Sequence, residues 1–392
     1  MTESFPEGFA GAAVEARIRK PGRLDLALVV GERAFPATAL WTRNLVQAAP
    51  ILVNKQHLLT TGNQVRAILV NSGCANAATG EQGLANARRC AELVARSVGC
   101  QPEEVLLFST GVIGAQLPME RIEAALPALA RGRSRDALPL LNRAMMTTDT
   151  REKRAARSLT TGAGPVTLVG TAKGAGMIRP DMATMLAFLF TDAVTTADMA
   201  TFLRAAADQS FNSLTVDGDT STNDSVLLWS SARRKLSGNV DEQAFLTALE
   251  GVGTDLAKAI ARDGEGATKL ITVRVTGAPS AVDARQVAHV IAESPLVKTA
   301  VHGCDPNWGR ILAAAGRAGI QFEPNQATVW VGDHVVYDAA GPHPENEDGA
   351  HRHLLGEQVV LRIDLARGRG EAHCFTCDFS AEYVKVNASY RS

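Results

Sequence analysis

The segment KGAGMIRPDMATML, residues 173–186, combines residue types that suit chemistry on the protein backbone itself. Gly174 and Gly176 permit positive φ, and a turn held in place by the surrounding fold can store strain at such positions. Thr184 opens an apolar run directly after this turn, so its hydroxyl follows the Ala183 carbonyl in the chain. The order of residues therefore predicts attack by the Thr184 hydroxyl on the Ala183 carbonyl.

This attack would convert the peptide bond to an ester, and hydrolysis would leave Thr184 as a new amino terminus. A free α-amine has an ordinary pKa of about 7.7–8.0, so part of it is neutral near pH 7 and can act as general base. One cleavage would thus supply both nucleophile and base without a separate histidine. For an arbitrary threonine, β-strand propensity is the simpler explanation, so the hypothesis depends on the rest of the chain.

The rest of the chain resembles one family, the ornithine acetyltransferases (glutamate N-acetyltransferases). Residues 173–186 are similar to the family segment that contains the scissile Ala-Thr bond. Further segments resemble family blocks in the same order: NSGCANAATG (71–80), STGVIG (109–114), MTTDT (146–150), DGDTSTND (217–224), RDGEGATK (262–269), GCDPNWGRI (303–311) and YVKVNASYRS (383–392). The resemblance covers nearly the whole chain.

The resemblance implies self-cleavage and a nucleophile. Cleavage between Ala183 and Thr184 would give an α chain, residues 1–183, and a β chain, residues 184–392, with Thr184 as nucleophile. The family's oxyanion hole falls on Thr110 and Gly111 in STGVIG, where donors must point at the oxygen that becomes negative.

The resemblance also implies a set of substrate-binding residues: Thr147, Lys173, Thr184, Glu265, Asn387 and Ser392. Their types fit amino-acid substrates, because Lys173 can bind a carboxylate and Glu265 an ammonium group through charge-assisted hydrogen bonds. A functional carboxyl-terminal tail implies that the last residues are docked against the site.

The implied reaction moves acetyl from N-acetylornithine to glutamate through an acetyl-Thr184 intermediate, in arginine biosynthesis. Acetyl-CoA is a second possible donor, and no metal or organic cofactor is required. The family assembly is α2β2. Departures from the family pattern are Asp181, where asparagine is more usual, and the amino-terminal AGAAVEARIRK and ALWTRN, which bear on substrate choice.

Two other functions fit parts of the sequence. Water in place of glutamate would make the protein an amidase or aminopeptidase of the same self-cleaving type, and loss of cleavage would leave a non-catalytic amino-acid-binding module. A lone G-x-G without a third glycine argues against dinucleotide binding.

Composition and charge favour small-molecule partners. Lys plus Arg number 40 against 41 for Asp plus Glu, so the net charge of -1 offers no attraction to nucleic acid or an anionic membrane. The start, MTESFPEGFAGA, lacks the pattern of a signal peptide, and no run of about 18 apolar residues predicts a membrane span. We expect a cytoplasmic protein.

The six cysteines are scattered, which is typical of reduced thiols rather than a disulfide framework. Five residues include a C-x-x-C and could form zinc ligands: His302, Cys304, His373, Cys374 and Cys377. Alternation in HCFTCDFS favours buried cysteines on a strand instead.

Periodicity predicts an α/β fold, and the resemblance makes it a layered sheet-and-helix fold of the ornithine acetyltransferase type, self-cleaved into two chains. Strands are expected at 24–31, 66–71, 163–170, 184–191, 270–276, 328–338 with a hairpin at 331–334, and 357–364. Helices are expected at 84–98, 117–130, 198–211, 241–262 and 284–293. Pro127 should kink or end its helix, 341–355 should be an exposed loop, and a further lobe should begin near 280.

Overall fold

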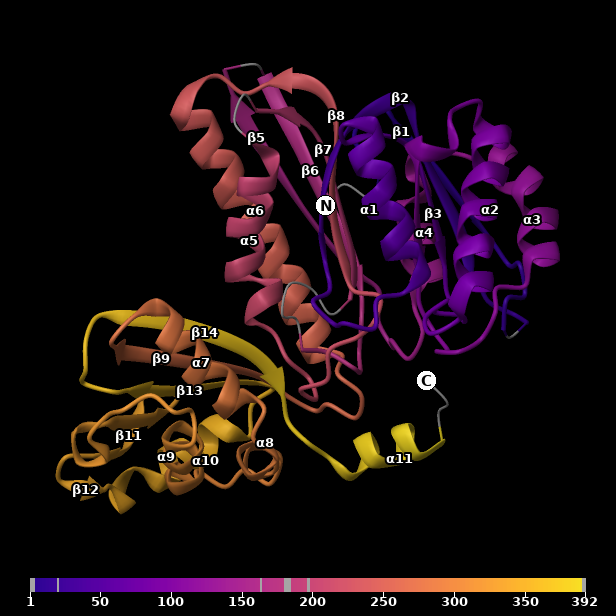
Figure 1. Cartoon of the computed structure of the whole chain (residues 1–392). Coiled ribbons are helices and arrows are strands. Elements are labelled where there is room, and N and C mark those ends of the chain that lie inside the picture. The colour runs from indigo at the N-terminus through magenta and orange to yellow at the C-terminus, as the bar shows by residue number, and fades with distance from the viewer. Residues whose placement is uncertain (1–3, 20, 163, 180–184, 196–197, 390–392) are drawn as a thin grey trace.

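The structure is a computed structural model that describes every residue except 1–3, 20, 163, 180–184, 196–197 and 390–392. Figure 1 shows two lobes, each built on its own sheet. In the described residues the larger lobe has an eight-stranded sheet. Seven of its strands follow the order β4-β3-β2-β8-β7-β6-β5, and the eighth, β1, pairs with β2. The smaller lobe has a six-stranded sheet of order β12-β11-β10-β13-β9-β14. The layered α/β fold class expected from the sequence is confirmed.

The strands of the larger lobe are β1 (Phe9–Val14), β2 (Leu26–Trp41), β3 (Gln64–Asn71), β4 (Val105–Ser109), β5 (Lys153–Thr161), β6 (Gly164–Lys173), β7 (Leu186–Val194) and β8 (Ser225–Lys235). Its helices are α1 (Ala49–Thr61), α2 (Gly80–Val98), α3 (Met119–Arg131), α4 (Leu138–Met145), α5 (Met199–Gln209) and α6 (Gly238–Arg262).

The larger lobe has its core in three layers, because its strands are apolar on both faces. Helices α1, α2 and α3 pack on one face of β2, β3 and β4, and α5 and α6 pack on the outer face of β5 to β8. Between them, α4 and aromatic side chains such as Phe108, Phe188 and Trp229 fill an inner layer shared by both halves of the sheet. Burial on both faces gives near-continuous apolar runs, as in β7 (LAFLFTDAV).

The smaller lobe packs helices on one face of its sheet. Its elements are β9 (Leu270–Ala278), α7 (Ala281–Ala292), α8 (Pro295–His302), α9 (Trp308–Gly316), β10 (Thr328–Val331), β11 (His334–Asp338), β12 (Gly341–Pro342), α10 (Glu347–Leu354), β13 (Gln358–Asp364) and β14 (Gly370–Cys377). Alternating residues of β9 and β13 face the helices in one apolar core. The first strand of this lobe thus begins at Leu270, whereas we expected the lobe to begin near residue 280. From β14 the chain returns toward the larger lobe as α11 (Ala381–Ser389), seen in yellow in Figure 1.

The expected helices and strands are present, and two local expectations are wrong. For Pro127 we expected a kink or a helix end, and the helix end is wrong, because α3 runs to Arg131. Pro127 lies on the exposed face, where water can satisfy the freed Glu123 carbonyl. The segment 341–355 is not a loop, because it contains β12 and α10, which buries Ala350 and Leu354 in the core of the smaller lobe.

Three strand ends of the larger lobe meet at one point. Lys173, the last residue of β6, pairs with Leu186, the first described residue of β7, and Leu186 pairs in parallel with Ser225, the first of β8. The end of β4 is linked to this point by Asn223, whose Nδ2 donates to the Ser109 carbonyl (2.9 Å). This alignment creates one site from distant segments.

Candidate active site

A pocket of about 250 Å³ opens where these strand ends meet. The residues that line it come from both before and after position 184 in the sequence, and one of them is Met185. Six residues implied by the family resemblance line it together: Thr110, Gly111, Thr147, Lys173, Glu265 and Asn387. Four residues named from the sequence lie outside the described residues: Ala183, Thr184, Ser392 and Asp181, where the family more usually has asparagine.

Lys173 and Thr110 are in direct contact at the base of the pocket. Lys173 is 8% exposed, and its Nζ donates to Thr110 Oγ1 (3.1 Å). The Thr110 amide donates to the Asn71 carbonyl (3.0 Å), so the donors this pair can offer an oxyanion are the Thr110 hydroxyl and the Gly111 amide. The hydroxyl accepts from Lys173 and keeps its own proton for donation.

Gly111 must be glycine for two reasons. Its φ is +129°, and a Cβ atom would lie 2.4 Å from the Gly73 carbonyl carbon. Asn223 fixes the loop beside it, donating to the Ala75 carbonyl (2.7 Å) as well as to Ser109. The backbone around Thr110 and Gly111 is therefore held rigidly against a neighbouring loop.

Glu265 and Asn387, which also line the pocket, are in direct contact. Asn387, on the exposed α11, donates through Nδ2 to Glu265 Oε2 (2.7 Å). The Glu265 carboxyl also lies over Gly176, where a Cβ would be 2.4 Å from Oε2. Gly176 is thus needed for this close approach rather than for positive φ, which occurs instead at Gly174 (+152°) and Met177 (+54°).

A second acid, Asp217, holds the turn that leads toward residue 180. Its Oδ2 and Oδ1 accept from the amides of Met177 (2.7 Å) and Ile178 (2.8 Å). Tyr383, on α11, donates its hydroxyl to the same carboxylate (3.2 Å). Asp217 therefore ties this turn to the carboxyl-terminal helix.

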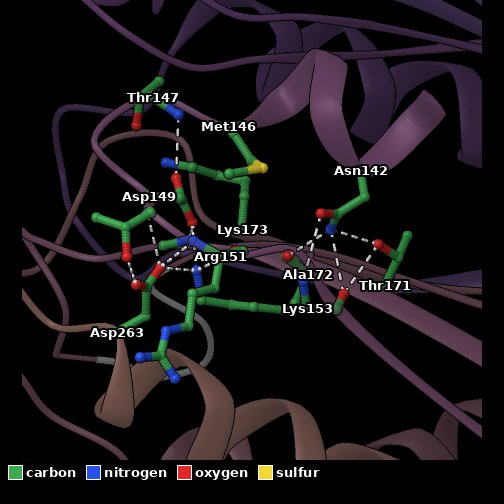
Figure 2. A network of polar contacts seen from close by, with 12 residues as sticks. Asn142, Met146, Thr147, Asp149, Arg151, Lys153, Thr171, Ala172, Lys173 and Asp263 are labelled. Carbon is green, nitrogen blue, oxygen red and sulfur yellow. Dashed lines mark hydrogen bonds and ion pairs between the residues drawn. The ribbon is translucent and has the colours of Figure 1, made fainter. Parts of the chain in front are cut away.

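Behind the pocket lies a set of buried charges that we call the charge cluster: Asp149, Lys153 and Asp263 (Figure 2). Lys153 Nζ lies 2.7 Å from Asp149 Oδ1 and 2.6 Å from Asp263 Oδ2, and the three side chains are at most 4% exposed. Asp149 also accepts from the amides of Thr147 (3.0 Å) and Gly174 (2.6 Å). The charge cluster thereby positions Thr147 and the backbone after Lys173.

These surroundings shift the pKa values of both Asp149 and Lys173. Burial opposes ionisation of Asp149, but Lys153 and Lys173, with the hydrogen bonds from Lys153 and Gly174, outweigh it and bring the pKa of Asp149 to about 2. Burial lowers the pKa of Lys173, and the second ammonium, Lys153, adds to the effect, although the charges of Asp149, Asp224 and Glu265 oppose it.

Several pocket residues were assigned no role from the sequence. Asp224, which is 2% exposed, lines the pocket, as do Asp217 and Tyr383. Lys153 and Asp263 belong to the charge cluster. Asp217, Asp224, Asp263 and Tyr383 belong to segments that resemble family blocks, which was the available signal. The sequence does not show which residues pair when they are more than a hundred positions apart, as Lys153 and Asp263 are.

The cysteines are all free, and Cys374 and Cys377 are buried on β14, as expected. Among the described residues no group of three or more His, Cys, Asp or Glu side chains is arranged to hold a metal ion. Within the same residues, no helix combines the length and apolar character needed to cross a membrane.

Comparison with known proteins gives a consistent result. The model of the ArgJ family matches residues 10–392. The arginine biosynthesis bifunctional protein ArgJ of Dehalococcoides mccartyi is 45% identical, covering 98% of this chain and 96% of its own length. The protein of that name from Symbiobacterium thermophilum is 45% identical over 99% and 98%. A structure of ornithine acetyltransferase with ornithine, from Mycobacterium tuberculosis, matches at 37% identity over 47% of this chain and 98% of that chain, with a TM-score of 0.43.

Proposed function

Because this chain belongs to the ArgJ family, we propose that it is an acetyltransferase of arginine biosynthesis, which moves acetyl from N-acetylornithine to glutamate. The observation that supports this most is the pocket, where six residues from five distant segments come together: Thr110, Gly111, Thr147, Lys173, Glu265 and Asn387. An acyl acceptor and donor that are both amino acids need a carboxylate-binding cation and an ammonium-binding anion. Lys173 and Glu265 offer this pair.

The nucleophile in this proposal is Thr184, freed by cleavage after Ala183. Its hydroxyl attacks the acetyl carbonyl of N-acetylornithine, and its own α-amine takes the hydroxyl proton. The negative oxygen of the tetrahedral intermediate accepts hydrogen bonds from the Thr110 hydroxyl and the Gly111 amide. Lys173, which donates to Thr110 Oγ1 (3.1 Å), polarises that hydroxyl and strengthens its donation.

Collapse of the intermediate breaks the bond between the acetyl carbon and the ornithine nitrogen. The α-ammonium returns its proton to the departing nitrogen, ornithine leaves, and the acetyl group stays on Thr184 as an ester. The α-amine of glutamate then attacks the ester in the same way, which releases N-acetylglutamate and restores the hydroxyl. Two easier steps replace one direct transfer.

Substrate binding in this proposal uses two charged residues that line the pocket. Lys173 binds a substrate carboxylate, while Glu265, oriented by Asn387 (2.7 Å), binds an ammonium group. Thr147, fixed by Asp149, and Ser392 complete the contacts.

The finer activity also belongs to the proposal. We infer glutamate N-acetyltransferase activity, with acetyl-CoA as a possible second donor for amino-acid N-acetyltransferase activity. We further infer that the α and β chains assemble as α2β2 in the cytoplasm, and that the reaction requires neither a metal nor an organic cofactor.

A product assay tests the proposal. Purified protein is incubated with N-acetylornithine carrying a labelled acetyl group, with and without glutamate, and products are identified by mass spectrometry. We expect labelled N-acetylglutamate that depends on glutamate. Labelled free acetate at the same rate with or without glutamate would identify an amidase instead, and binding without turnover would identify a non-catalytic module.

A further inference from the structure

A second cavity, of about 590 Å³, lies between the two lobes. Helices α5 and α6 line one side of it, and strands β9, β13 and β14 line the other. It shares no described lining residue with the pocket, so it is a separate site that does not depend on the proposed function. We call it the basic groove, because three cations and one acid line it: Lys258 on α6, Arg274 on β9, Arg362 on β13 and Glu371 on β14.

Strand register places the two arginines of the basic groove side by side. Arg274 pairs with Arg362 on one neighbouring strand and with His373 on the other. Neighbouring strands are about 4.8 Å apart, and paired residues point to the same face of the sheet. Here that face is opposite to Val273 and Leu361, which face the helices of the smaller lobe. Like charges at paired positions destabilise a sheet, and an anion held between the two guanidinium groups would remove this repulsion.

The described part of the chain supplies no counter-charge to these cations. Within it, none of Lys258, Arg274 and Arg362 forms an ion pair with a carboxylate. Lys258 Nζ instead lies 5.3 Å from the centre of the Phe375 ring, and the Arg362 guanidinium lies 4.0 Å from that of Trp330. The Arg362 Nε atom is buried and has no hydrogen-bond partner among the described residues. A buried donor without an acceptor is unfavourable, so an anion would satisfy it.

The imidazole of His373 lies in the same positive field. Burial lowers the pKa of His373, although its contact with the Gln209 carbonyl, 3.0 Å from Nε2, opposes the shift. The charges of Lys258, Arg274 and Arg285 lower this pKa further. The basic groove is thus electropositive, whereas the whole chain has a net charge of -1.

We propose that the basic groove binds a small phosphate-bearing anion, held by the guanidinium groups of Arg274 and Arg362 and the ammonium group of Lys258. One guanidinium fork occupies both oxygens of a carboxylate, whereas a phosphate has further oxygens for a second fork. Three cations less the one acid, Glu371, leave a charge of +2, which a phosphate dianion balances. A volume of about 590 Å³ also leaves room for an organic group on the phosphate, since sites for small organic ligands span roughly 300–1,000 Å³.

Isothermal titration calorimetry of the full-length protein with pyrophosphate, at low ionic strength, tests this site. The variants Arg274→Gln and Lys258→Gln each remove one exposed cation, from opposite sides of the basic groove. Arg352→Gln is the matched control, because Arg352 is an exposed arginine of the smaller lobe, on α10, that does not line the groove. Circular dichroism reports whether each variant is folded.

We expect one pyrophosphate per chain and a Kd about 10-fold higher, or more, in Arg274→Gln and in Lys258→Gln, because each variant loses a charge-assisted hydrogen bond. Arg352→Gln should keep Kd within about twofold. Arg274→Lys, which keeps the charge but loses the fork, should have an intermediate Kd. Citrate, whose anionic groups are carboxylates, should bind about 10-fold more weakly than pyrophosphate.

A titration with ADP distinguishes two sources of the phosphate group. Binding at least as tight as that of pyrophosphate, with the same loss in Arg274→Gln, would support a phosphate attached to an organic group. Weaker binding of ADP would support the free inorganic anion.

The proposal would be overturned if folded wild-type protein showed no saturable binding of pyrophosphate. Binding that is unchanged in both Arg274→Gln and Lys258→Gln would also overturn it, because the anion would then lie elsewhere. Equal losses in Arg352→Gln and Arg274→Gln, or citrate binding as tight as that of pyrophosphate, would show attraction of anions in general rather than a phosphate site. If a glutamine variant fails to fold, Arg274→Lys takes its place in the comparison.

Discussion

The charge cluster and the wall of the pocket both contain buried lysine and aspartate, yet they are built differently. In the charge cluster, Lys153 is paired with two carboxylates at 2.6 and 2.7 Å, and backbone amides complete Asp149 and Asp263. On the pocket wall, Lys173 donates to a hydroxyl, and one oxygen of the Asp224 carboxyl has no hydrogen-bond partner among the described residues. The two lysines end up about equally buried, at 1% and 8% exposure.

This difference separates structural from chemical use of the same residue types. A buried charge is tolerated when every partner is present, and losing one partner leaves the others uncompensated. The charge cluster meets this condition and fixes backbone. The pocket wall does not meet this condition, and its unfilled hydrogen-bonding capacity is what a substrate can use.

The largest effect should come from Lys153→Met, which leaves Asp149 and Asp263 buried without their shared cation. We expect the free energy of unfolding to fall by about 3–5 kcal/mol. Urea denaturation in the Thr184→Ala background would measure this, since all variants there should be single chains. Arg157→Met, which breaks an exposed pair with Asp255, should cost at most about 1 kcal/mol. Equal losses for the two variants would contradict the distinction.

The same substitution on the pocket wall, Lys173→Met, should act on activity instead. In the proposed function this cation binds a substrate carboxylate and polarises Thr110, so its loss should lower kcat/KM by about 100-fold, equivalent to roughly 2.7 kcal/mol. Stability should change little, because the ammonium of Lys173 is itself destabilised by burial. Steady-state kinetics and urea denaturation check both parts, and a stability loss as large as that of Lys153→Met would make Lys173 a structural residue.

Acid should weaken the charge cluster over a defined range. Because the folded-state pKa of Asp149 is about 2 and its ordinary value is 3.8, its ionisation stabilises the fold above about pH 4. That contribution, about 2 kcal/mol, should be lost as pH falls from about 4 through 2. Urea denaturation from pH 6 to pH 2 would show it as a loss that is reduced in Asp149→Asn. An identical pH dependence in that variant would contradict the assignment.

The smallest effect should come from Tyr383→Phe, which removes one hydrogen bond between α11 and Asp217. A neutral donor to a carboxylate contributes about 1.5–3 kcal/mol at most, and part-exposure reduces this, so we expect kcat/KM to fall only a few-fold. Tyr337→Phe, in the smaller lobe on β11, is the matched control and should leave kinetics unchanged. Equal effects of the two variants would show that α11 does not contribute to the site through Tyr383.

The sequence predicted which residues line the pocket better than it predicted the buried residues that hold them in place. Thr110, Gly111, Thr147, Lys173, Glu265 and Asn387 lie in motifs that can be matched one by one, and all of them line the pocket. Lys153 and Asp263 are 110 positions apart, and nothing local marks their pairing. Asp224 was within a matched segment, DGDTSTND, but its unpaired oxygen is a property of the folded site.

The fold shows the same division. Strongly periodic elements such as α2 and α6 were predicted within a few residues, because an amphipathic helix has its pattern in the sequence. Helix α10 was missed because three of its eight residues are the consecutive polar residues His351, Arg352 and His353, which resemble a polar loop. At Pro127 a local rule predicted a helix end that does not occur. Pro127 lies on the exposed face of α3, and that placement depends on packing.

The most direct test of the central claim is the intact mass of wild-type and Thr184→Ala protein under denaturing conditions. The account predicts two wild-type fragments that divide between Ala183 and Thr184, and one full-length chain for the variant. A single uncut chain in both preparations would contradict self-cleavage and, with it, the role of Thr184 as nucleophile.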